Sequence, residues 1–85
     1  MDDQSTLGRH AAMVDYKRVL AQNVKAARKE LGLSQEALAL ETDIDRTYIS
    51  GIERALRNPS LTLIIKLAGC LKTTPASLLT PKGRT

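Results

Sequence analysis

The chain has 85 residues, 42% of them apolar and 26% charged, which fits one folded domain and excludes a disordered chain. Lys and Arg number 13 against 9 acids, so the net charge of +4 modestly favours an anionic partner. A single cysteine, Cys70, excludes an internal disulfide and a thiolate metal cluster, while a single histidine, His10, leaves little for metal binding or Ser-His-Asp catalysis.

Residues 1–12 are polar or small and show no period, so we expect a flexible N-terminal arm. A first helix is predicted from about residue 14 to residue 31, because Leu20, Val24, Ala27 and Leu31 recur at helical spacing. Gly32 follows directly, and glycine at this position is typical of a helix end.

Four further helices are predicted, because each would begin behind a residue whose side chain can cap a helix: Ser34, Asp45, Ser60 and Thr74. They would cover 35–42, 46 to about 54, 61 to about 71, and a short segment from Pro75 that ends before Pro81. No window alternates with a period of two residues. The predicted fold is therefore all-α, a compact five-helix domain over residues 13–81 with a tail over 82–85.

The segment 35–54 combines two short predicted helices with a three-residue turn. Small Ala39 would lie where the two helices cross, while Ile44, Ile49 and Ile52 would give the pair an apolar underside. Glu53 falls on that same side. The spacing therefore predicts that the second helix has one face turned to the core and one face turned outward.

The outward face of this second helix would carry Arg46, Thr47, Ser50 and Gly51. Such a compact polar face fits the major groove of DNA, where Arg can bind O6 and N7 of guanine and Thr can contact the thymine methyl group. We expect Gly51 to leave room for a close approach to DNA. The absence of Phe and Trp disfavours binding of single-stranded nucleic acid, which relies on stacking platforms.

The run LGLSQEALALETDIDRTYISGIERALRNPSL resembles the lambda-repressor-like, Cro/XRE-type helix-turn-helix family of transcription regulators. The matching positions include Leu-Gly-Leu-Ser-Gln, Leu38-Ala39, Ile44, Ile49, Ile52-Glu53 and Asn58-Pro59-Ser60-Leu61, and the resemblance extends from about residue 17 to residue 79. Asp43 departs from the pattern, because the family usually has glycine in the turn. Asp tolerates the left-handed conformation better than most residues, so the turn is expected to survive.

The resemblance implies a docking of this domain on double-stranded DNA. The residues expected to face base edges are Arg46, Thr47 and Ser50, and those expected to contact the sugar-phosphate backbone are Gln35, Tyr48, Arg54, Arg57 and Asn58. It also implies that Arg28 and Glu53 form a structural ion pair between the first helix and the recognition helix. The plainer alternatives are that the outward face of the second helix is only solvated, and that Arg28 and Glu53 are ordinary surface charges.

The predicted helix after Ser60 has more apolar residues than one core needs. If Ile64, Leu67, Ala68 and Leu71 face inward, a second apolar set is left over, and we expect it to form a dimer interface: Leu63, Ile65, Leu78 and Leu79. A homodimer would place two recognition helices about 34 Å apart on a palindromic operator. A monomer with a few exposed apolar residues is the alternative.

The leading hypothesis is a cytoplasmic, homodimeric DNA-binding regulator that is not an enzyme and needs neither metal nor cofactor. It is similar to the controller proteins of restriction–modification systems, and small phage or plasmid repressors are close alternatives. A second hypothesis is an antitoxin-like protein-interaction module, and an enzyme is the weakest. No membrane partner is expected, because Leu61–Leu71 is too short to span a bilayer and the N-terminus lacks a secretory pattern.

Overall fold

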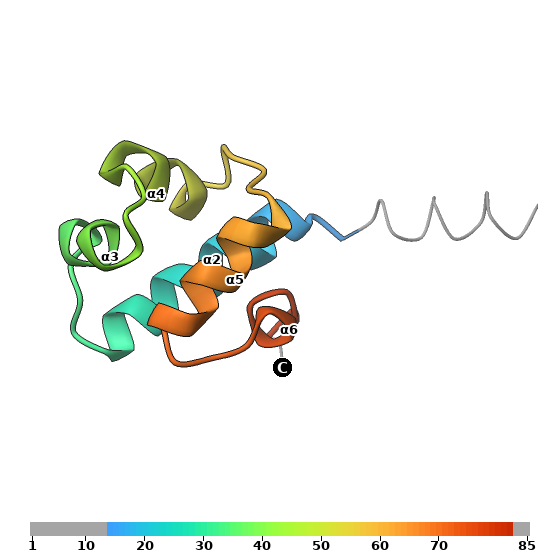
Figure 1. The fold of residues 1–85 in the computed structure, drawn as a ribbon. Helices are drawn as coiled ribbons and strands as arrows, with labels where there is room; N and C mark the ends of the chain where they lie inside the picture. The colour runs from blue at the N-terminus through green and yellow to red at the C-terminus, as the bar shows by residue number, and fades with distance from the viewer. Residues whose placement is uncertain (1–13, 83–85) are drawn as a thin grey trace, which may run out of the picture.

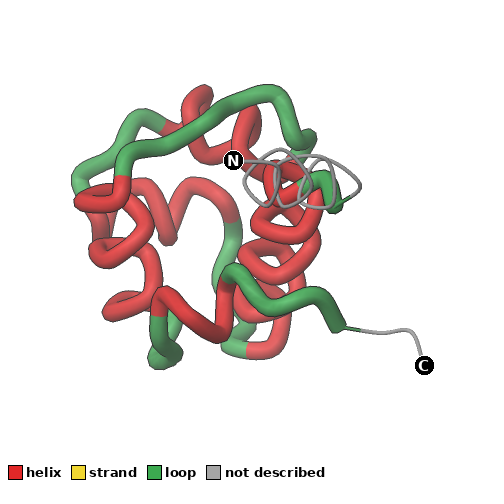
Figure 2. The backbone as a smooth tube through the Cα atoms, turned by 90° about the vertical axis from the view of Figure 1, so that its right-hand side faces the viewer, coloured by secondary structure: helices red, strands yellow, loops and turns green. Residues whose placement is uncertain are grey.

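The computed structural model of the chain describes residues 14–82, which form five helices and no strand (Figure 2). This confirms the predicted all-α fold. The expected arm over residues 1–12, with His10, and residues 83–85 of the expected tail lie outside the described residues. None of the described helices is long and apolar enough to cross a membrane. No three His, Cys, Asp or Glu side chains among residues 14–82 are grouped as metal ligands.

In chain order the helices are α2 (Tyr16–Glu30), α3 (Gln35–Thr42), α4 (Arg46–Glu53), α5 (Leu61–Cys70) and α6 (Pro75–Leu78). The predicted capping residues all act as such, since each side chain accepts a hydrogen bond from a backbone N–H two or three residues later: Ser34, Asp45, Ser60 and Thr74. Gly32 ends the first helix with a φ of 70°. The helix boundaries therefore follow from local chemistry.

The core fills the space between all five helices. In Figure 1, α2 and α5 cross the middle of the molecule, α3 and α4 lie to the left, and α6 lies below α5. Helix α4 packs against α2 and α3, while α6 packs against α2 and α5. The residues of the long apolar helix that were expected to face inward are buried: Ile64, Leu67, Ala68 and Leu71. This packing leaves α4 at the edge of the molecule with one side exposed.

The turn between α3 and α4 forms without glycine. Asp43 closes α3 with a φ of 58° and a ψ of 35°, which is the left-handed conformation. This conformation costs about 1 kcal/mol for most residues and less for Asp. The next residue, Ile44, is buried, and its N–H donates to the Ala39 carbonyl at 3.1 Å. The turn thus brings Asp45 into position to begin α4.

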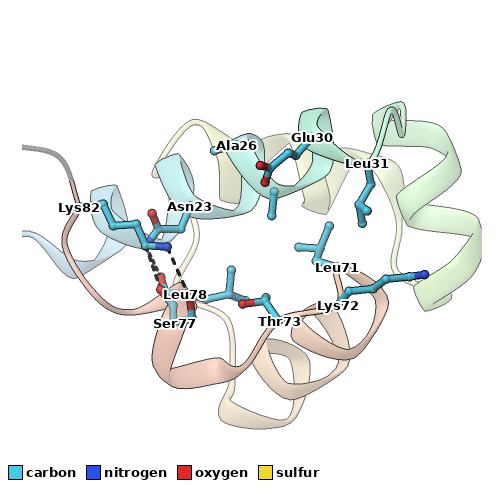
Figure 3. A pocket seen from close by; sticks show the side chains of 11 residues that line it. Asn23, Ala26, Glu30, Leu31, Leu71, Lys72, Thr73, Ser77, Leu78 and Lys82 are labelled. Carbon is cyan, nitrogen blue, oxygen red and sulfur yellow. Dashed lines mark hydrogen bonds between the residues drawn. The ribbon is translucent and has the colours of Figure 1, made fainter.

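Asn23 is a buried polar side chain on α2 that the sequence did not single out. Its amide nitrogen Nδ2 donates to the backbone carbonyls of Ser77 and Leu78 at 3.3 and 2.8 Å (Figure 3). It also donates to the Thr80 carbonyl at 3.0 Å. These carbonyls lie in and just after α6, a helix of four residues that has few hydrogen bonds of its own. Asn23 therefore holds the last helix against the first.

Leu78 corrects one expectation, because its side chain is 2% exposed and belongs to the core. It faces α2, and a dimer interface at this residue is wrong. Helix α6 is too short for a periodic pattern to show which of its two leucines faces inward.

Cys70 lies half-buried against the core, where its thiol donates to Glu41 Oε1 at 3.0 Å. Burial, followed by this hydrogen bond and the charge of Glu41, raises the pKa of Cys70 to about 11. The thiol is therefore protonated at neutral pH, and a protonated thiol is a poor nucleophile. Cys70 is therefore a packing residue of the core and not a reactive thiol.

We expect Asn23→Ala to lower the free energy of unfolding by about 1–3 kcal/mol, because part-buried carbonyls at the end of α6 lose their donor. Gln22→Ala, at the neighbouring exposed position on α2, is the matched control. It should change stability by less than about 0.5 kcal/mol. Thermal unfolding followed by circular dichroism measures both variants, and equal stabilities would contradict the role of Asn23.

Candidate nucleic-acid interface

Helix α4 has the two-sided character that its sequence predicts. Ile49 and Ile52 are 0% and 1% exposed and fix its underside in the core. Arg46 and Thr47 are exposed in its first turn, and Ser50 is half-buried one turn later. The hydrogen bond of 3.2 Å from the Thr47 N–H to the Asp45 side chain fixes where the helix begins. A short polar surface with two hydroxyls and a guanidinium thus faces solvent.

Arg28 of α2 and Glu53 of α4 form a buried ion pair. Arg28 Nε lies 2.7 Å from Glu53 Oε2 and Nη2 lies 2.9 Å from Oε1, and the two side chains are 10% and 3% exposed. Arg28 Nη1 also donates to the Leu33 carbonyl at 2.8 Å. The hydrogen bond to Glu53 raises the pKa of Arg28, so the guanidinium stays charged despite its burial. The pair fixes the end of α4 against α2.

Gln35, the first residue of α3, lies between this ion pair and Arg46. Its Nε2 donates to Glu53 Oε1 at 3.0 Å, and its Oε1 accepts from Arg46 Nη1 at 3.2 Å. The family resemblance predicts this side chain at a DNA phosphate. In the structure both ends of the amide are already engaged within the protein, by partners 18 and 11 residues away along the chain that no sequence pattern indicates.

Arg57 packs against one side of α4, over Tyr48 and Gly51. Its guanidinium carbon is 5.2 Å from the centre of the Tyr48 ring, a cation–π contact. A Cβ atom added at Gly51 would lie 2.8 Å from Arg57 Cγ. Gly51 is buried under this side chain, so the expectation that it leaves room for DNA is wrong. Its missing side chain makes room for Arg57 instead.

The other expected backbone contacts lie near Arg57. Arg54 is the exposed C-cap residue of α4, and Asn58 is exposed in the connection that leads to α5. Three cationic side chains therefore lie on or beside α4: Arg46, Arg54 and Arg57. Each of these side chains presents hydrogen-bond donors to solvent.

Helix α5 carries an exposed apolar strip. Ile65 is 52% exposed, and Leu61, one helical turn earlier, is 65% exposed. Leu63 and Leu79 were expected in a dimer interface too, but both are half-buried and pack against the core. Leu61 is not among the residues predicted for the interface, although its spacing of four residues from Ile65 carries the signal.

Comparisons with known proteins agree with this geometry. The helix-turn-helix family model HTH_3 matches residues 24–78. Control protein C.SmaI of Serratia marcescens is 44% identical over 70 residues, which cover 82% of this chain and 83% of that protein. The crystal structure of the restriction–modification controller protein C.AhdI from Aeromonas hydrophila is similar with a TM-score of 0.70 and 42% identity, over 73% of this chain and 94% of that one.

A third relative was solved with DNA. The restriction–modification controller protein C.Esp1396I, a tetramer in complex with its natural 35 base-pair operator, is similar with a TM-score of 0.68 and 33% identity. The similarity covers 74% of this chain and 83% of that one. With matches over most of its length, this chain belongs to the Cro/XRE-type helix-turn-helix family, a family of DNA-binding transcription regulators rather than of enzymes.

Proposed function

We propose that the chain is a sequence-specific transcription regulator that binds double-stranded operator DNA through the outer face of α4. The observation that carries the proposal is the exposure of Arg46 and Thr47 on a helix whose opposite side is buried. A helix presented in this way fits the major groove with its N-terminal residues at base edges. In this docking Arg46 binds a guanine, and Thr47 and Ser50 contact neighbouring base pairs.

The proposed contacts with the DNA backbone flank α4 on both sides. Arg57, Asn58 and Tyr48 would bind phosphates at one end, with Arg54 beside them. The first backbone N–H groups of α3 would bind a phosphate at the other end, because such groups lack partners within their helix. These contacts supply affinity without sequence preference.

We further propose that the regulator is a homodimer on a palindromic operator, with Leu61 and Ile65 of α5 at the centre of the interface. The relative C.Esp1396I binds its operator as a tetramer, which supports an oligomeric form. Because C.SmaI and C.AhdI are control proteins, the setting that fits best is the regulation of restriction–modification genes in the bacterial cytoplasm.

Arg46→Ala and Arg57→Ala are expected to affect DNA binding in different ways. Loss of Arg46 should cost about 1–3 kcal/mol of binding free energy and relax the preference at one base pair. Loss of Arg57 should weaken binding to all duplexes alike and reduce the salt dependence of the binding constant by about one phosphate contact. Fluorescence anisotropy with a duplex selected from a random pool, and with its single-base-pair variants, separates the two. Uniform losses for both variants would contradict the proposed division between base and phosphate contacts.

Gly51→Ala should weaken DNA binding without weakening the fold. Alanine favours a helix by about 1 kcal/mol over glycine, but the new Cβ would displace Arg57 from Tyr48. We therefore expect the unfolding temperature to be unchanged or raised, while affinity for every duplex falls as it does in Arg57→Ala.

Gly69→Ala is the matched control for this substitution. Gly69 is also helical, and a Cβ atom there meets nothing within 4 Å. It should gain the same helix propensity and keep full affinity in the anisotropy assay. If Gly51→Ala binds DNA as the unchanged chain does, Arg57 is not held in a binding position by the space at Gly51.

If the chain forms a dimer through this strip, Ile65→Asp should reduce its mass in solution from that of a dimer to that of a monomer. A buried, unpaired carboxylate at the centre of the interface is strongly unfavourable, so the variant should sediment as a monomer. Leu40→Asp is the control, because Leu40 is 80% exposed on α3. Sedimentation equilibrium should find this control dimeric. A dimeric Ile65→Asp variant would place the interface elsewhere, and a monomeric unchanged chain would favour a protein partner for this strip instead.

A further inference from the structure

Helix α2 carries a row of cations on the side that faces away from the core. Arg18, Lys25 and Lys29 are exposed and follow one another at seven and four residues, so their side chains share one face of the helix. Gln22, between the first two, is exposed as well. These four residues are called the basic face below. The other side of α2 is apolar and buried, with Val24 0% exposed.

No acidic side chain among the described residues neutralises the basic face. The salt bridge within residues 14–82 joins Arg28 to Glu53, and none of the cations of the basic face takes part in one. The acids at the two ends of α2 lie elsewhere. Asp15 caps the helix by accepting hydrogen bonds from two backbone N–H groups, and Glu30 lines the cavity between α2 and α6 (Figure 3). The basic face therefore carries three positive charges that attract an anion.

The basic face is continuous with the proposed DNA interface. Arg28, which binds Glu53 of α4, follows Lys25 by three residues, so Lys25 lies beside the contact between the two helices. From Lys29 back to Arg18 the row covers about 16 Å along the helix axis. One strand of duplex DNA carries a phosphate about every 3.4 Å along its axis. The row therefore matches a run of about five phosphates.

The chemistry of the basic face favours a polyanion over a protein partner. Protein interfaces have an apolar centre and are depleted in lysine. The row from Arg18 to Lys29 contains no apolar side chain, so a protein would find no centre to bury there. Ammonium groups on flexible stems bind phosphates as point charges, and such contacts carry no base preference.

We propose that the basic face of α2 binds the phosphate backbone of the duplex that flanks the operator. The inference rests on the proposed function, in which α4 holds the operator. The phosphates beside α4 are assigned to Arg57, Asn58, Tyr48 and the start of α3, so the basic face adds contacts beyond them. These contacts add affinity and salt dependence and leave the discrimination between base pairs unchanged.

The test compares the selected duplex with the same duplex extended by about ten base pairs, one helical turn, on each side. The double variant Lys25→Gln with Lys29→Gln removes two charges and keeps the helix propensity. On the extended duplex, the fall of log K with log salt concentration should be less steep in this variant by about 3.6, the counterion release of four phosphate contacts in a dimer. On the short duplex the variant and the unchanged chain should give the same slope.

Lys72→Gln with Lys82→Gln is the matched control, because it removes the same charge at two exposed lysines. Both line the cavity beside α6, which no residue of α4 lines. This control should keep the slopes of the unchanged chain on both duplexes. An equal loss of slope in the two double variants would show an effect of net charge alone and would overturn the proposal. A loss in Lys25→Gln with Lys29→Gln on the short duplex as well would place the contacts inside the operator and would overturn it too.

The outcomes separate this inference from the function on which it rests. A chain that selects no preferred duplex overturns the proposed function. A chain that selects one, but binds the short and the extended duplex with the same salt dependence, overturns the role of the basic face alone. A double variant at Lys25 and Lys29 that keeps its salt dependence and changes its mass in sedimentation equilibrium would show a contact with an acidic surface of a second copy, and this result also contradicts the proposal.

Discussion

The buried ion pair between Arg28 and Glu53 determines how the polar side of this small protein is arranged. Two charges with 10% and 3% exposed side chains are tolerated only because each polar atom has a partner: the fork of two hydrogen bonds, the Leu33 carbonyl and the Gln35 amide. Such a pair adds little net stability over an apolar pair, but removal of one partner leaves an uncompensated charge. Its value is geometric, because it permits one relative position of α2, α3 and the end of α4.

Helix α4 depends on this constraint more than a long helix would. Eight residues are too few for a helix to be stable on its own in water, so its place and its rotation come from tertiary contacts. Ile49 and Ile52 hold one side in the core, and Glu53 fixes its last turn against α2. The same contacts that form the helix therefore aim Arg46 and Thr47 outward. The contacts that stabilise the fold are therefore also the contacts that present the polar face to solvent.

The sequence predicts what depends on neighbours along the chain. Capping by Ser34, Asp45, Ser60 and Thr74 is a local property, and so the helix boundaries and the all-α class follow from it. Contacts between distant residues carry no such pattern. Asn23 meets α6 across more than 50 residues, and Arg57 lies on Gly51 because the chain after α4 folds back over it. In α6, four residues give no period that separates a buried Leu78 from a half-buried Leu79.

The small size of the polar face explains why two copies suit the proposed function. A good contact between a side chain and a base pair is worth about 1–3 kcal/mol of discrimination, and specific recognition by typical regulators requires about 4–10 kcal/mol over non-specific binding. One copy of the face offers only three such side chains, Arg46, Thr47 and Ser50, and Ser50 is half-buried. Their combined discrimination lies at the lower end of what specific recognition requires. Repeating the face by two-fold symmetry doubles the contacts without enlarging the fold.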